Sequence, residues 1–184
     1  VAQGRLSNYD SDLFAPLLAA IGHRAGAEYG AMEQADRSMR VIADHLRAIT
    51  FLMADGVLPS NEGRGYVLRR IPRRAARHGR LLGITEPFLH ELTATVVENM
   101  GEAYHELRPA AGTVAEATRG EEERFLATLD QGLPILNDML SKVKASGQPV
   151  LQGTETFKLY DTYGFPMDLI AEACREQGVT LDET

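Results

Sequence analysis

The chain has 184 residues, of which 44% are apolar, and carries a net charge of -7. This length and apolar content suit one domain or two small ones with a genuine hydrophobic core. No apolar run approaches the roughly 20 residues of a membrane span and no signal segment opens the chain, so we expect a cytoplasmic protein that does not enter a membrane.

The single cysteine, Cys174, excludes a disulfide framework and is expected to be a buried thiol. Because Val1 is not preceded by methionine, we expect a piece of a longer protein.

Apolar residues recur with a period of about 3.6 and no segment sustains a period of two, so the sequence predicts an all-α multi-helix bundle. Capping residues and turns set the approximate limits of each helix. In chain order we expect helices from Asp10 or Ser11 to about Tyr29, from Asp36 to the Asp55-Gly56 turn, through an arginine-rich stretch to Gly79 or Gly83, from Thr85 to about Leu107, from Thr113 to Ala145, from Thr154 to Tyr163 and from Pro166 to Gln177.

The segments around these helices complete the expected organisation. Residues 1–9 should form a leading tail, and residues 146–153 an internal loop before the C-terminal pair of short helices. Gly132 and Pro134 should break or bend the long helix that contains them. We expect residues 1–184 to form one helical domain.

The stretch RGYVLRRIPRRAARHGR, from Arg64 to Arg80, contains seven arginines and no carboxylate, so the residues outside it sum to a charge of -14. A basic stripe on an otherwise acidic protein is expected of a surface that binds a polyanion such as nucleic acid. Arginine is also the cation that contacts phosphate through two donors at once. The alternative is a solvated helix surface whose arginines pair with acids from neighbouring elements.

Helical geometry divides this stretch into two faces at about 100° per residue. With Arg69 at zero, five further arginines fall between roughly 20° and 140°, namely Arg70, Arg73, Arg74, Arg77 and Arg80. The core face falls between roughly 180° and 260° and consists of Leu68, Ile71, Ala75, His78 and Leu82. No Glu or Asp lies at helical spacing to neutralise the arginine face. We therefore expect nucleic-acid backbone to contact Arg69, Arg70, Arg73, Arg74 and Arg77.

No pattern in the sequence predicts catalysis or metal binding in this segment. The five histidines share no metal-ligand spacing, and Gly63-Arg64-Gly65 lacks the third glycine and the preceding strand of a dinucleotide-binding loop. No nucleophile elbow or pair of carboxylates stands out, so we predict binding and not catalysis, with no cofactor in this segment. The run Glu121-Glu122-Glu123 is expected to be a solvated helix face.

Three segments resemble one family closely. They are SNYDSDLF at Ser7–Phe14, the segment at Val41–Gly79 that contains DGVLPSNEGRGYVLRR, and FKLYDTYGFPMDLI at Phe157–Ile170. In this order they resemble the part of bacterial alanyl-tRNA synthetases that follows the catalytic domain, and the resemblance covers essentially the whole chain. The sequence departs from this resemblance at Pro72 and Ile170, where relatives more often have an aliphatic residue and a threonine.

This resemblance implies a fragment of alanine-tRNA ligase, a class II aminoacyl-tRNA synthetase, that lacks the catalytic site. The catalytic domain, with ATP and alanine sites, would precede the segment, and an editing domain with zinc-binding residues would follow it. ATP and zinc are thus expected only in the parent protein. The partners implied are the acceptor stem of alanine tRNA, recognised by a G·U wobble pair, and the catalytic and editing domains of the same chain.

The resemblance assigns recognition of the wobble pair to Asn61, in the P-S-N-E block, and to Asp161, in the Y-D-T-Y-G-F-P block. A wobble pair leaves the guanine exocyclic amine without its usual partner, and an ionised carboxylate is a natural acceptor for it. The alternatives are a helix cap for Asn61 and a surface carboxylate for Asp161. The neighbouring rings are expected to be core residues that position Asp161, the alternative being platforms on which bases stack; they are Phe157, Tyr160, Tyr163 and Phe165. A helical protein-interaction module with a basic docking face remains the alternative function.

Overall fold

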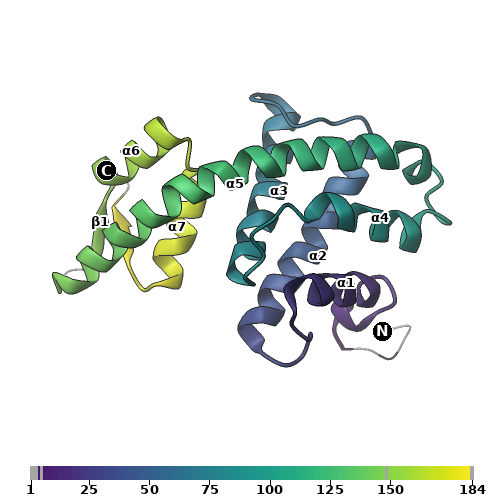
Figure 1. Ribbon diagram of the computed structural model, residues 1–184, viewed down its shortest axis with the longest axis horizontal. Coiled ribbons are helices and arrows are strands. Elements are labelled where there is room, and N and C mark those ends of the chain that lie inside the picture. The colour runs from purple at the N-terminus through teal and green to yellow at the C-terminus, as the bar shows by residue number, and fades with distance from the viewer. Residues whose placement is uncertain (1–3, 5, 148, 183–184) are drawn as a thin grey trace. The chain divides into compact units, whose positions relative to one another are not determined.

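A computed structural model describes residues 4, 6–147 and 149–182. The described residues form seven α-helices, one short 3₁₀ turn and two three-residue strands, which confirms the predicted all-α class. Figure 1 shows the order of these elements along the chain. They are η1 (Asn8–Asp10), α1 (Ala15–Ala25), α2 (Glu33–Ala54), α3 (Gly63–Leu81), α4 (Leu89–Met100), α5 (Leu107–Ala145), β1 (Val150–Gln152), α6 (Gly153–Tyr163), α7 (Met167–Glu176) and β2 (Thr180–Asp182).

The chain divides into two compact units, Val1–Arg124 and Phe125–Thr184. Helix α5 begins in the first unit and ends in the second. Each unit has its own buried apolar side chains.

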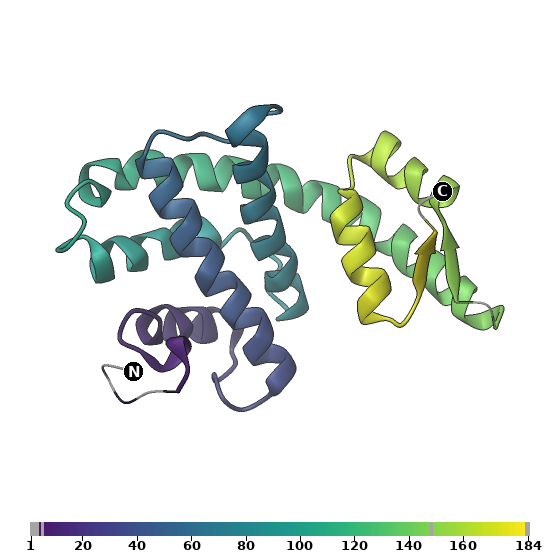
Figure 2. The ribbon, with the colours of Figure 1, turned by 180° about the vertical axis from the view of Figure 1, so that it is seen from behind.

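In the first unit, α2 is the central helix and packs against α1, α3 and α4. Figures 1 and 2 show α2 and α3 side by side from opposite directions. One cluster of the core joins α2, α3 and the start of α5 through Ile49, Met53, Leu68 and Val114. These side chains come from the apolar faces predicted by the 3.6-residue period, and their burial fixes which side of α3 faces outward.

The predicted cap of the second helix is wrong. Helix α2 starts at Glu33, so Asp36 lies inside its first turn. The Asp36 side chain is buried, and its Oδ1 accepts a hydrogen bond from the backbone N–H of Gly30 at 2.7 Å. Asp36 therefore holds the preceding loop against the helix instead of capping its first N–H groups.

The arginine-rich helix α3 continues through Pro72 and ends at Leu81. Gly83, with φ at +85°, has the left-handed conformation predicted for a residue after the helix end. Gly79 instead lies within the helix, where a Cβ would come within 2.4 Å of the Phe88 ring. This glycine permits the close approach of α3 and the segment that leads into α4.

The second unit contains two short strands that the sequence analysis missed. Strands β1 and β2 pair in parallel with Leu151 opposite Leu181, within a region predicted to be loop and chain end. Helices α6 and α7 pack next to them. Helix α5 is not broken at Gly132 or Pro134. Gly132 lies against the buried ring of Phe165, 2.3 Å from where a Cβ would stand.

Two further expectations concern the thiol and the membrane. Cys174 is buried in α7 as predicted, and burial raises the pKa of its thiol. Among the described residues, no helix is both long and apolar enough to span a bilayer.

Candidate nucleic-acid interface

Helix α3 presents two faces, as its sequence predicts. Leu68, Ala75 and His78 are buried on the inner face, whereas Arg70 and Arg74 are exposed on the other. The remaining predicted arginines are less accessible: Arg69 and Arg73 are half-buried and Arg77 is buried.

A buried carboxylate from α5 lies beside this helix. The Glu121 side chain is only 2% exposed, and its Oε1 accepts from Arg69 Nε at 3.0 Å and from Arg73 Nε at 2.6 Å. Its Oε2 lies 3.2 Å from Arg124 Nη2. The expectation of a solvated acidic face is therefore wrong for Glu121. Arg69 and Arg73 therefore pair with an acid from a neighbouring helix, as the alternative interpretation of the arginine stretch predicted.

The next glutamate is buried for a different reason. Glu122 accepts hydrogen bonds from the backbone N–H groups of Phe88 and Leu89, at 2.9 and 3.1 Å, where α4 begins. The N–H groups at a helix start have no partner within the helix, so this carboxylate satisfies two of them. The pKa of the Glu122 carboxyl is raised, because the effect of burial exceeds the opposing effect of these two hydrogen bonds. Only Glu123, which pairs with Arg119, is exposed as the sequence analysis expected.

Asn61 lies just before the N-cap of α3 and is exposed. Its side-chain oxygen Oδ1 accepts a hydrogen bond from Nη1 of Arg69, which lies eight residues later, on α3. The N-cap residue is Glu62, which makes no side-chain cap hydrogen bond. The helix-cap alternative for Asn61 is therefore wrong, and the Asn61 side chain is instead hydrogen-bonded to Arg69 of α3.

A glycine allows the loop of Asn61 to lie close to α3. A Cβ on Gly65 would stand 2.1 Å from Ser60 Oγ and 2.5 Å from the carbonyl oxygen of Leu58. The Ser60 hydroxyl also donates to the carbonyl of Glu62 at 2.9 Å. The backbone on both sides of Asn61 is thus packed against the first turn of the helix.

One histidine near the arginines adds no positive charge at neutral pH. Burial, followed by electrostatic repulsion from Arg74 and His78, lowers the pKa of His45 to about 4. The His45 imidazole is therefore neutral at pH 7 and adds no positive charge to the guanidinium groups nearby.

Asp161 belongs to the second unit and is exposed in the last turn of α6. The helix ends at Gly164, which has a left-handed φ of +66°. A carboxylate in this position opposes the helix dipole by roughly 0.3 to 1 kcal/mol, so helix stability does not favour it. The structure leaves this side chain accessible to a ligand.

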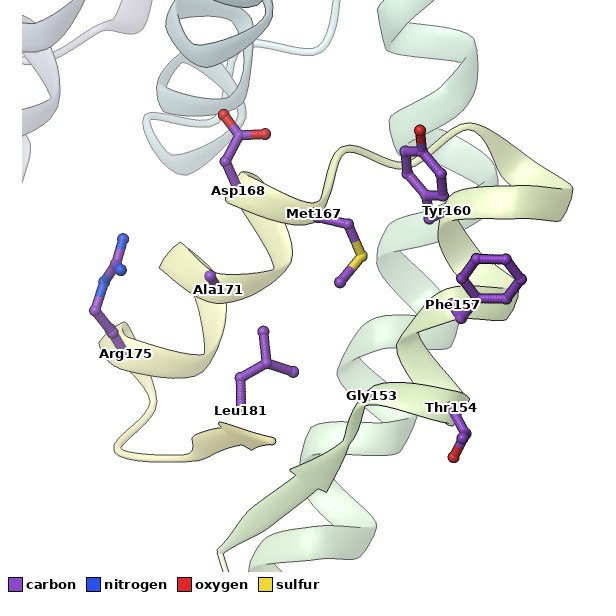
Figure 3. A pocket seen from close by; sticks show the side chains of 9 residues that line it. All are labelled: Gly153, Thr154, Phe157, Tyr160, Met167, Asp168, Ala171, Arg175 and Leu181. Atoms are coloured by element: carbon purple, nitrogen blue, oxygen red, sulfur yellow. The ribbon is translucent and has the colours of Figure 1, made fainter. Parts of the chain in front are cut away.

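The aromatic residues near Asp161 differ from the prediction. Phe165 is buried, as expected, and Tyr163 is half-buried, but Phe157 and Tyr160 are 59% and 51% exposed, with ring centroids 6.3 Å apart. Figure 3 shows the two rings on α6, with Met167 on the neighbouring α7. Together with the rest of the lining they border a groove of about 780 Å³, formed by Gly153, Thr154, Phe157, Tyr160, Met167, Asp168, Ala171, Arg175 and Leu181.

The predicted site residues therefore belong to two units. Asn61 and the five arginines are in the first, with Arg69 joined to Asn61, while Asp161 is in the second. Within the described residues, no group of three or more His, Cys, Asp or Glu side chains is arranged to hold a metal ion.

Comparison with known proteins places the chain in a family. It is 57% identical over 176 residues to a protein named alanine–tRNA ligase from Bordetella bronchiseptica, covering 96% of this chain and 20% of that protein. It is 51% identical over 183 residues to the protein of the same name from Thermoanaerobacter sp. strain X514, covering 100% of this chain and 21% of that protein. The chain spans about one fifth of the length of these relatives. The family model described as tRNA synthetases class II (A) matches residues 1–184, so the chain belongs to this family of class II tRNA synthetases.

Proposed function

We propose that this chain is the part of an alanine–tRNA ligase that binds the acceptor stem of alanine tRNA and recognises a G·U wobble pair in it. The observation that carries the proposal is the exposed amide of Asn61, which is hydrogen-bonded to Arg69 of α3. The same helix exposes Arg70 and Arg74. Stem recognition needs this combination, because phosphate contacts position a protein and base contacts specify the sequence. The names of the relatives support tRNA as the ligand.

The arginines of α3 would contact the tRNA backbone. Arg70 and Arg74 are exposed and can reach phosphates directly. Arg69, Arg73 and Arg77 are half-buried or buried, and they would add positive charge to the same helix while packing fixes its position.

The base contacts would come from Asn61 and Asp161. A-form RNA exposes base edges and 2′-hydroxyls in its wide minor groove, where short polar side chains can reach them. The Asp161 carboxylate would accept from the guanine amine that the wobble pair leaves unpaired, and the Asn61 amide would contact another edge atom.

The attachment of alanine would take place elsewhere in the parent protein. We propose that a catalytic domain of the same chain binds ATP and alanine, that an editing domain holds zinc, and that this segment presents the stem to both. The parent protein would act in the cytoplasm.

The backbone contacts can be tested with a double change of Arg70 and Arg74 to glutamine in this chain. We expect binding of all tRNAs to weaken alike, because phosphates carry no sequence information. The slope of log affinity against log salt should become shallower by about two, one for each lost phosphate contact. Fluorescence anisotropy with alanine tRNA and an unrelated tRNA over a salt series measures both quantities.

Arg119→Gln provides the matched control, since Arg119 is exposed on α5 and pairs with Glu123. This variant should bind as the unchanged chain does. Salt-insensitive tRNA binding, or a loss of affinity in Arg119→Gln as large as that in the double variant, would remove α3 as the phosphate-binding element and favour a protein-docking face instead.

A further inference from the structure

We infer that Glu121 is a positioning residue for base recognition: by holding the Arg69 guanidinium, it fixes the orientation of the Asn61 amide. This inference rests on the proposed function of Asn61. All three residues lie in the first unit, so the contacts that join them belong to one compact body.

The first link is the buried carboxylate. Glu121 is 2% exposed and contacts three guanidinium groups, those of Arg69, Arg73 and Arg124. A buried carboxylate is costly unless charged partners and hydrogen bonds compensate it, and here the partners hold it in one place. The Glu121 carboxylate is therefore held in one position. The exposed Glu123, by contrast, forms a surface ion pair with Arg119, and such pairs contribute little to stability.

The second link is the guanidinium of Arg69, which uses two different nitrogen atoms. Nε donates to Glu121 and Nη1 donates to Asn61. Because the guanidinium is planar and rigid, fixing Nε also fixes the direction of Nη1. Without the carboxylate, the Arg69 side chain would regain the rotamer freedom that long side chains have on a helix surface.

The third link is the orientation of the Asn61 amide. Arginine donates hydrogen bonds and accepts none, so the amide oxygen must be the atom that faces Arg69. The NH₂ group is then left to face a ligand as a donor. The packed backbone around Gly65 limits where Asn61 can lie, and the Arg69 bond decides which end of its amide is presented.

These contacts give the three consecutive glutamates different roles. Glu121 acts on recognition through Arg69, Glu122 stabilises the start of α4, and Glu123 lies on the surface. A change at Glu121 should therefore alter which stem is preferred, beyond any effect on stability.

The test uses the full-length ligase that contains this segment, with the changes Glu121→Gln, Asn61→Ala and both together. The readout is the ratio of kcat/KM for charging a wobble tRNA to that for its G·C counterpart. This ratio does not depend on how much of a preparation is folded, since both tRNAs are charged by the same enzyme sample. Glu121→Gln should lower the ratio about tenfold, and the double variant should lower it no further than Asn61→Ala, because coupled residues are not additive.

Two controls complete the design. Glu123→Gln should leave the ratio unchanged, and Glu121→Asp, which keeps the charge, should retain more of the ratio than Glu121→Gln. If Asn61→Ala lowers the ratio and Glu121→Gln does not, the inference about Glu121 is overturned while the proposed function stands. If Asn61→Ala itself leaves the ratio unchanged, the proposed role of Asn61 fails and the inference fails with it.

Discussion

Asp161→Asn in the full-length ligase should reduce the preference for a wobble stem over a G·C stem by about 1 to 3 kcal/mol, the range for a good base contact. The change keeps the shape of the side chain but removes the charge, so the guanine amine loses its strongest acceptor. Asp161 is exposed in the last turn of α6, and we expect little change in stability. The measurement compares kcat/KM for charging the two tRNAs.

Glu155→Gln is the matched control for this change. Glu155 is also an exposed carboxylate on α6, in its first turn. It should not affect the preference. An Asp161→Asn enzyme that still favours the wobble tRNA as strongly as the unchanged enzyme would show that Asp161 does not contact the pair.

Gly79→Ala and Gly132→Ala should each destabilise the chain by about 1 to 3 kcal/mol, the usual cost of overpacking a core. The added Cβ would lie 2.4 Å from a ring atom of Phe88 at Gly79 and 2.3 Å from one of Phe165 at Gly132. Both rings are buried, so they cannot swing away into solvent. Urea unfolding followed by circular dichroism measures the loss, and the two changes test the two units separately.

Gly112→Ala gives the opposite expectation on the same secondary structure. Gly112 lies within α5 with nothing within 4 Å of the position of a Cβ. Alanine should therefore stabilise the chain by roughly 0.5 to 1 kcal/mol through its better helix propensity. Gly79 or Gly132 variants that gained stability as Gly112→Ala does would mean that the two phenylalanine rings are not packed as described.

The sequence predicted the helices best where one apolar face is sufficient to define them. Helices α6 and α7 start and end within about two residues of the prediction, and the inner face of α3 is buried as the helical angles require. The parallel pairing of β1 and β2 was missed because each strand has only three residues, too few to display a period of two. Pairing between segments distant in sequence leaves no local signal.

The surroundings of the arginines could not be predicted from the arginine stretch itself. Their partner Glu121 is about fifty positions away in sequence, on another helix. A signal for its burial was nevertheless present: at about 100° per residue, Glu121 and Glu122 lie within roughly 80° of Val114 and Thr118, whereas Glu123 lies roughly 140° to 180° away from them. The predicted solvated face at Glu121-Glu122-Glu123 followed from the charge of the three glutamates and not from their positions around the helix, and it was wrong for Glu121 and Glu122.

The aromatic side chains near Asp161 show the complementary error. Phe157 and Tyr160 were expected in the core, where they would position Asp161, yet they line an open groove. The large apolar area of an aromatic side chain favours burial but does not decide which ring is buried. Phe165 is buried because Gly132 leaves room for its ring against α5. Contacts with another helix, such as that between Phe165 and Gly132, decide which of several neighbouring rings is buried. The sequence of α6 alone does not predict these contacts.

The proposed function depends on recognition of the wobble pair of the alanine acceptor stem by this chain. The most direct measurement is equilibrium binding of the chain to two short acceptor-stem hairpins that differ only in carrying G·U or G·C at that pair, at one fixed low salt concentration. We expect tighter binding to the wobble hairpin, by about fivefold or more, since a base contact contributes roughly 1 to 3 kcal/mol. Equal affinity for the two hairpins would contradict it.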